Sequence, residues 1–110
     1  MYIYYNNKLI KEACLNPTSH GFQFGYGVFE TILVKNGLPC FANEHYKRLL
    51  KACSKLGLTL SLDIETICTQ VETLAQVCNI TEGRLKIICF RDTGTDAAIM
   101  TLSHYKPEAE

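Results

Sequence analysis

The sequence predicts an α+β fold in which a mostly antiparallel sheet is covered on one face by two helices. Three observations support this prediction: two hairpin-like segments open the chain, two segments with a helical spacing of apolar residues follow, and two strand-like segments come last. Strands and helices are therefore segregated along the chain. Because parallel βαβ units need alternating strands and helices, this order favours an antiparallel sheet.

Each predicted hairpin has a turn that accepts positive φ angles. The first joins "MYIYY" to "KLI" through Asn-Asn, and the second joins "VFETILVK" to "LPCF" through Asn-Gly. The segment "CLNPTSHG" between the hairpins is a predicted loop. Alternation along "VFETILVK" places Phe29 on one face and Glu30 on the other. Glu30 thus shares its face with the aliphatic residues Val28, Ile32 and Val34.

Two amphipathic helices are predicted in the middle of the chain. The first is capped by Asn43 and ends at Gly57, and the second runs from about Asp63 to Cys78. Their apolar residues recur every three or four positions, as expected for a buried helical stripe. These positions are Tyr46, Leu49, Leu50, Cys53 and Leu56 in the first helix, and Ile64, Ile67, Val71, Leu74, Ala75 and Cys78 in the second.

The last two predicted strands are "RLKIICF" and "AAIMTLSHY", which are joined by the polar connection "RDTGTD". Residues 1–105 are expected to form one domain. The final segment "KPEAE", residues 106–110, is predicted to be a frayed tail or the start of an interdomain linker.

Composition narrows the classes of function. The chain has 110 residues, 47% of them apolar, which suits one compact core and is too short for two ordinary domains. Eleven basic residues balance eleven acidic ones, so we expect neither nucleic acid nor a membrane surface as partner. The chain lacks a long apolar run and a signal-peptide start, so a cytoplasmic location is expected. The six cysteines include no Cys-x-x-Cys pair, which favours reduced packing residues over disulfides or a metal site.

The stretch "HGFQFGYGVFETI" combines glycines with aromatic rings. Its glycines match neither the dinucleotide-binding nor the P-loop motif, because no Gly-Lys-Ser/Thr and no helix start follow them. Glycines that let the backbone lie flat against a ligand or a neighbouring chain remain possible. Phe22, Phe24 and Tyr26 alternate along this stretch and point one way from an extended segment. Part of their surface is available to a ligand or a second subunit.

Arg48 has two possible roles on position alone. It lies one turn from His45, beside the apolar stripe of the first helix, so it is either a solvated charge or a bidentate ligand for a phosphate or carboxylate. Glu30, Arg84 and Arg91 are open to the same two interpretations, as surface charges or as ligand contacts.

The segment "HGFQFGYGVFETILVKNGLPCFANEHYKRLLKACSKLGL" resembles the N-terminal domain of the class IV, or fold-type IV, pyridoxal-phosphate enzymes. These include branched-chain and D-amino-acid aminotransferases and aminodeoxychorismate lyase. The most specific parts are Gly-x-Gly-Val-Phe-Glu-Thr and the His-x-x-Arg-Leu helix that follows. The resemblance implies the small N-terminal domain of the D-amino-acid aminotransferase-like fold, a homodimer, and an active site between this domain and a larger C-terminal one.

The resemblance also implies roles for individual residues. In this family the arginine of the helix binds the phosphate of pyridoxal 5'-phosphate (PLP), which assigns that role to Arg48, and His45 supports the placement of the helix. No catalytic residue is expected in this chain, because the lysine that carries the cofactor belongs to the C-terminal domain. The chain alone is therefore expected to be inactive. By the same match, the substrate-lining residues would be Phe24, Tyr26, Phe29, Glu30 and Arg84.

Within the family, two phenylalanines favour one subfamily. Branched-chain aminotransferases usually have Tyr at the position of Phe24, and D-amino-acid aminotransferases usually have Tyr at that of Phe29. The resemblance therefore favours aminodeoxychorismate lyase, which converts 4-amino-4-deoxychorismate to 4-aminobenzoate and pyruvate for folate synthesis. The alternatives are a fragment of either aminotransferase, or a non-catalytic stand-alone interaction domain.

Overall fold

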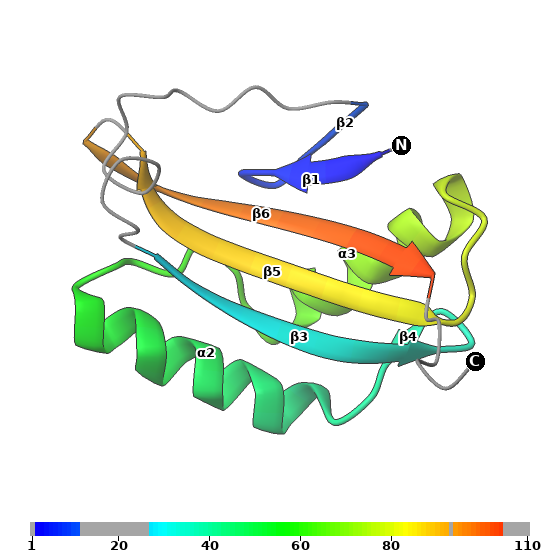
Figure 1. Ribbon diagram of the computed structural model, residues 1–110, viewed down its shortest axis with the longest axis horizontal. Helices are drawn as coiled ribbons and strands as arrows, with labels where there is room; N and C mark the ends of the chain where they lie inside the picture. The colour runs from blue at the N-terminus through cyan, green and yellow to red at the C-terminus, as the bar shows by residue number, and fades with distance from the viewer. Residues whose placement is uncertain (1, 12–26, 93, 105–110) are drawn as a thin grey trace, which may run out of the picture.

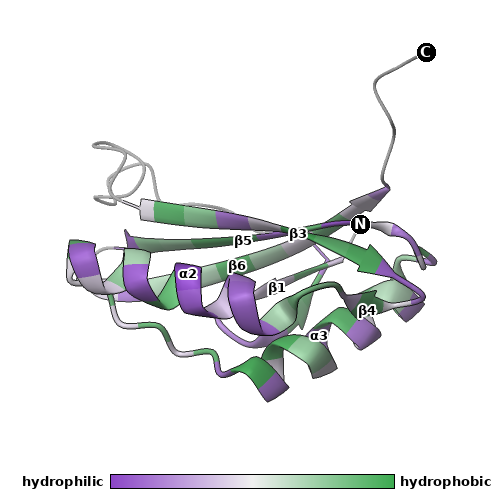
Figure 2. Cartoon of the chain, turned by 90° about the horizontal axis from the view of Figure 1, so that it is seen from below, coloured by the Kyte–Doolittle hydropathy of each residue, from purple (hydrophilic) through white to green (hydrophobic). Residues whose placement is uncertain are grey.

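The computed structural model describes residues 2–11, 27–92 and 94–104, and it confirms the α+β prediction. A six-stranded sheet has the order β2-β1-β6-β5-β3-β4, and all its pairings are antiparallel. Two helices cover one face of this sheet (Figures 1 and 2). The elements are β1 (Ile3–Tyr5), β2 (Lys8–Ile10), β3 (Gly27–Lys35), β4 (Leu38–Pro39), α2 (Ala42–Leu56), α3 (Ile64–Val77), β5 (Gly83–Asp92) and β6 (Thr95–His104).

Both predicted hairpins are present, and their turns have the expected backbone. Asn6 and Asn7 join β1 to β2 with φ angles of 50° and 68°, and Asn36 and Gly37 join β3 to β4 with 53° and 74°. The first turn is also tied to β6, because the Asn6 side-chain oxygen accepts a hydrogen bond from the Ala98 amide at 2.8 Å. Each turn therefore combines the positive φ angles that Asn and Gly tolerate with a fixed strand register.

The predicted N-cap of α2 is wrong, whereas its predicted end is confirmed. The N-cap is Phe41, which has a φ angle of 55° and no side-chain cap, so Asn43 already lies within the first turn. The chain enters α2 directly from the hairpin, since the Cys40 amide donates to the Leu33 carbonyl at 2.8 Å. At the other end Gly57 has a φ angle of 71°, a conformation that glycine adopts without strain.

The helix α3 begins close to the predicted start at Asp63, and the structure shows this residue to be its N-cap. The Asp63 carboxylate accepts a hydrogen bond from the Thr66 amide at 2.7 Å. This contact lowers the pKa of the Asp63 carboxyl group. The buried stripe of α3 includes one polar residue that the apolar spacing did not reveal, Gln70, whose Nε2 donates to the Asn7 side-chain oxygen at 2.8 Å.

The main core lies between the sheet and the helices. Side chains on the helix-facing side of β3 and β5 alternate with exposed ones, as the sequence pattern predicts. No helix within residues 2–11, 27–92 and 94–104 is long and apolar enough to cross a membrane. The fully buried members of the core include Ile32, Val34, Leu49, Val71, Leu74, Leu85, Ile87, Met100 and Leu102.

Candidate functional site

Three polar residues from the predicted motifs meet where α2 crosses β3. Glu30 comes from β3, and His45 and Arg48 come from neighbouring turns of α2. The Nδ1 atom of His45 lies 2.5 Å from Oε2 of Glu30, and the Nε atom of Arg48 lies 3.5 Å from the same oxygen. A spacing of three residues places both basic side chains on one side of α2. One carboxylate oxygen of the sheet therefore contacts both.

Glu30 is a buried carboxylate on an otherwise apolar face. Its side chain is 8% exposed, and its neighbours on that side of β3 are Val28 and Ile32. Burial of an ionised carboxylate is costly unless it is paired and hydrogen-bonded. His45 supplies a short hydrogen bond from Nδ1, and Arg48 supplies a positive charge. These two contacts explain how a carboxylate is tolerated at this position.

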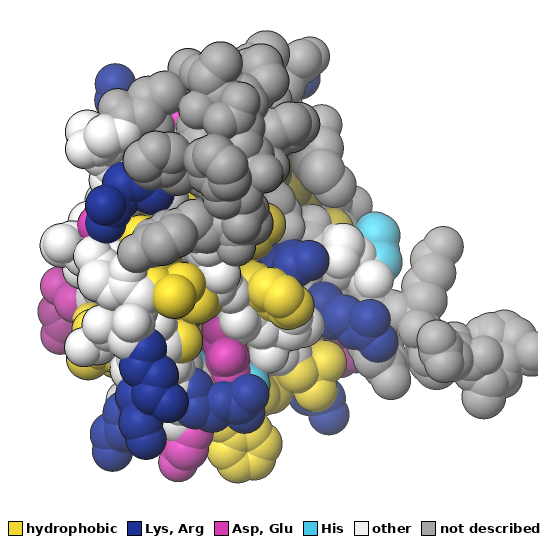
Figure 3. All heavy atoms as spheres, turned by 60° about the vertical axis from the view of Figure 1, so that its left-hand side comes forward, with side chains coloured by type: hydrophobic (Ala, Val, Ile, Leu, Met, Phe, Trp, Pro, Cys, Tyr) yellow, Lys and Arg dark blue, Asp and Glu magenta, His cyan; other side chains and the backbone are white. Residues whose placement is uncertain are grey.

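Arg48 combines an anchored end with an exposed one. Its side chain is 74% exposed, and within the described part of the chain its only ion pair is that with Glu30. A guanidinium group presents donors in a planar fork that matches the oxygens of a phosphate or carboxylate. Figure 3, which brings the left side of Figure 1 forward, shows that lysine and arginine side chains gather there beside exposed hydrophobic ones.

Phe29 lies on the opposite face of β3 from Glu30. Its side chain is 62% exposed, and Nζ of Lys86 on β5 lies 4.6 Å from the centroid of its ring. A cation over an aromatic face at this distance is attracted by the ring quadrupole. The structure therefore groups Glu30 with Arg48, and Phe29 with Lys86, on different faces of the sheet.

The other predicted substrate-lining residues do not meet at Phe29. Arg84 shares its face, but it pairs with Leu33, whereas Phe29 pairs with Ile88. Four residues along a strand separate Arg84 from Ile88, which is roughly 13 Å at about 3.3 Å per residue. Phe24 and Tyr26 lie outside the described residues. Lys86 pairs with Thr31, two residues along β3 from Phe29, and the sequence analysis missed it because this register joins strands far apart in the chain.

The glycine that precedes "VFET" has a structural reason. Gly27 pairs with Phe90, and a side chain added at Gly27 would place its Cβ atom 2.8 Å from the Cys89 carbonyl oxygen. Glycine therefore permits the close approach of β3 to β5 at the start of the strand. This contact is made with the neighbouring strand, so Gly27 does not need a ligand to explain it. Gly25 lies outside the described residues.

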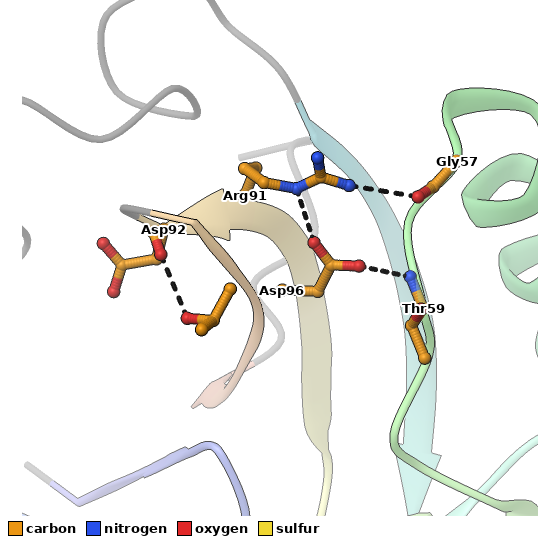
Figure 4. A network of polar contacts seen from close by, with 6 residues as sticks. Gly57, Thr59, Arg91, Asp92 and Asp96 are labelled. Carbon is orange, nitrogen blue, oxygen red and sulfur yellow. Dashed lines mark hydrogen bonds and ion pairs between the residues drawn. The ribbon is translucent and has the colours of Figure 1, made fainter.

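Arg91, the other arginine considered as an anion ligand, belongs to a separate structural network (Figure 4). Its Nε donates to Oδ1 of Asp96 at 2.6 Å and its Nη2 donates to the Gly57 carbonyl at 3.0 Å. The Thr59 amide donates to Oδ2 of Asp96 at 2.6 Å. This amide and then the Arg91 guanidinium lower the pKa of the Asp96 carboxyl. The network ties the segment after α2 to the turn between β5 and β6.

Among the described cysteines, Cys53 and Cys89 are buried in the core, and Cys78 packs against it. Cys40, Cys53, Cys68, Cys78 and Cys89 are all free thiols, and Cys14 lies outside the described residues. Burial raises the pKa of Cys89 to about 12. A thiol with such a pKa is a poor nucleophile at neutral pH, so no reactive role is indicated for it.

Comparison with known proteins gives relatives along almost the whole chain. The family model described as Amino-transferase class IV matches residues 27–110. An aminodeoxychorismate lyase of Bacillus subtilis is 29% identical over 108 residues, which cover 96% of this chain and 37% of that protein. A D-alanine aminotransferase of Bacillus licheniformis is 30% identical over 87 residues, which cover 77% of this chain and 31% of that protein. The chain thus spans about a third of the length of these relatives.

Solved structures show the same fold. The branched-chain amino acid aminotransferase of Escherichia coli superposes with a TM-score of 0.86 at 18% identity, over 99% of this chain and 41% of that one. A hypothetical aminotransferase of Mycobacterium tuberculosis in its PLP-bound form has a TM-score of 0.78 at 24% identity, over 96% of this chain and 40% of that one. The fold, the paired motifs and the family match together show that the chain belongs to the class IV aminotransferase family.

Proposed function

We propose that this chain is the part of a PLP enzyme that anchors the cofactor phosphate and lines the substrate. The observation that carries the proposal is the arrangement of Arg48, whose guanidinium is fixed at Nε beside a buried carboxylate and is otherwise exposed. The homologous fold of a PLP-bound aminotransferase supports the assignment. The chain has no residue that we assign to the chemical step.

The residues present fit the phosphate group of the cofactor. A phosphate needs several donors and a positive charge, and the terminal nitrogens of Arg48 provide both from one rigid group. When bound, PLP supplies an electron sink for reactions at the carbon that bears the amino group. This chain would hold the phosphate and orient the cofactor. The lysine that carries the cofactor would belong to a C-terminal domain, so we expect the chain alone to be inactive.

The proposed substrate side is the face that carries Phe29. Its exposed ring offers a flat apolar wall, and the ammonium group of Lys86 above it adds a positive charge suited to a carboxylate. Phe24, Tyr26 and Arg84 remain further predicted contacts on the substrate side.

The substrate that we propose is 4-amino-4-deoxychorismate, converted to 4-aminobenzoate and pyruvate for folate synthesis. An aminodeoxychorismate lyase matches 96% of this chain, whereas the D-alanine aminotransferase match covers 77%. A D-amino-acid aminotransferase is the second candidate, supported by the 30% identity of that relative. A branched-chain aminotransferase fragment and a stand-alone interaction domain are less favoured. We further propose that the full enzyme is a cytoplasmic homodimer.

Product analysis of the full-length protein separates the two catalytic candidates. Purified protein with PLP would be incubated with 4-amino-4-deoxychorismate, and separately with D-alanine and 2-oxoglutarate. The lyase proposal predicts release of 4-aminobenzoate and pyruvate in the first reaction and no glutamate in the second. Glutamate formation without 4-aminobenzoate would replace the lyase by the aminotransferase.

A further inference from the structure

We propose that Glu30 is a positioning residue that orients Arg48 toward the cofactor phosphate and does not itself contact substrate. This inference rests on the proposed phosphate role of Arg48. Oε2 of Glu30 lies 3.5 Å from Nε of Arg48, so the carboxylate attracts one edge of the guanidinium. At that distance the contact is an ion pair and not a hydrogen bond. It holds the Nε edge against the protein, and the two terminal nitrogens, which have no ion pair with any residue of 2–11, 27–92 or 94–104, are left for a ligand.

His45 holds the Glu30 carboxylate in the orientation in which it contacts Arg48. Its Nδ1 contacts the same Oε2 atom at 2.5 Å, so the oxygen that faces Arg48 cannot turn away without losing this hydrogen bond. Both contacts come from α2, while Glu30 belongs to β3. The three side chains therefore form a chain of contacts from the rigid sheet through the carboxylate to the exposed guanidinium.

The burial of Glu30 gives the arrangement its rigidity. Arginine has a long, flexible side chain, and a binding group gains affinity when this freedom is lost before the ligand arrives. A carboxylate that is 8% exposed has little freedom of its own. An exposed acidic residue on α2 would share the charge of Glu30 on β3 but not its fixed position.

The face on which Glu30 lies argues against direct substrate contact. The exposed ring of Phe29 marks the opposite face of β3, and Glu30 is covered by α2. A negative charge would also repel an anionic cofactor, unless that charge is already engaged by two basic partners. The geometry therefore gives Glu30 an effect on phosphate binding only through Arg48.

A double-mutant cycle tests this dependence in the full-length protein. Apparent dissociation constants are measured for PLP and for pyridoxal, which has the same ring and aldehyde but no phosphate. The dissociation constant of pyridoxal divided by that of PLP isolates the contribution of the phosphate. We expect Glu30→Gln to lower this ratio by about tenfold in the otherwise unchanged protein, within the range of coupled neighbouring residues. In the Arg48→Ala background we expect Glu30→Gln to change the ratio by less than about twofold, because the group through which it acts is gone.

Two further variants make the result specific. Asp96→Asn removes a carboxylate from another arginine, Arg91, and should leave the ratio unchanged. Glu30→Asp keeps the charge but withdraws it by about 1.5 Å, the length of one carbon–carbon bond, and should lower the ratio even if Glu30→Gln fails to fold. A ratio that Glu30→Gln and Glu30→Asp both leave unchanged would overturn the inference. So would an equal loss in the Arg48→Ala background. If Arg48→Ala itself leaves the ratio unchanged, Arg48 does not bind the phosphate and the proposed function fails. If only the Glu30 variants leave it unchanged, the positioning role of Glu30 fails and the phosphate role of Arg48 stands.

Discussion

His45→Ala should destabilise the fold by a measurable amount, because it removes the hydrogen-bond donor of a buried carboxylate. The side chain of Glu30 is 8% exposed, and His45 supplies its short contact at 2.5 Å. Breaking a fully buried ion pair by removing one partner costs about 3–5 kcal/mol, and leaving a buried polar group unsatisfied costs about 1–3 kcal/mol. Arg48 remains 3.5 Å away, and the His45 side chain is 21% exposed, so water can reach part of the space. We therefore expect a loss of about 2–3 kcal/mol, in the upper part of the range for an unsatisfied polar group.

Urea denaturation followed by circular dichroism measures this loss. For a small domain with a denaturant slope of about 1.5 kcal/mol per molar urea, the midpoint should fall by about 1.3–2 M. His104→Ala is the matched control, since His104 is exposed at the end of β6 and should change the free energy of unfolding by less than about 0.5 kcal/mol. If His45→Ala and His104→Ala had the same midpoint as the unchanged chain, Glu30 would not depend on His45 and the reasoning would be refuted.

Three further predictions concern the hydrophobic core, the reactivity of the thiols and the loss of folding stability at low pH. Leu85→Ala, at a side chain with 0% exposure, should lower the free energy of unfolding by about 3–5 kcal/mol in the same urea experiment, and a loss below about 1 kcal/mol would contradict the described core. Iodoacetamide at pH 8 should label the partly exposed Cys40 in the native chain well before Cys89, whose pKa is about 12, as mass spectrometry of peptides would show. The depressed pKa of Asp96 contributes stability above the pKa of the unfolded chain that is lost as pH falls through the folded pKa, so Asp96→Asn should flatten the decline in stability below about pH 4. If the free energy of unfolding of that variant declined at low pH as steeply as in the unchanged chain, Asp96 would not be the cause of the decline.

Local patterns in the sequence were sufficient to predict most of the fold. The Asn6-Asn7 and Asn36-Gly37 turns each rest on the chemistry of two residues, and the structure has both of them. The cap of α2 was mispredicted because the hairpin determines where the chain enters that helix. Asn43 lies two positions after the actual N-cap, Phe41, so its capping preference does not set the start of the helix.

The candidate site was predicted only in part, because its contacts depend on packing between distant elements. Alternation placed Glu30 among aliphatic residues, but it could not reveal that α2 would bring two basic side chains to it. The resemblance singled out Arg48 without indicating what holds its Nε edge. Lys86 was missed for the same reason, since its place above Phe29 follows from the β3–β5 register. Register between strands that lie far apart in the chain is a tertiary property.

Retention of PLP by the full-length protein tests the central claim most directly. Arg48→Ala and Lys47→Ala each remove one positive charge from neighbouring positions of α2, and both side chains are exposed. The proteins would be loaded with PLP and passed through a desalting column, and the bound cofactor would be measured by its absorbance near visible wavelengths. We predict that Lys47→Ala retains the cofactor as the unchanged protein does and that Arg48→Ala loses most of it. Equal retention by the two variants would contradict the phosphate role of Arg48.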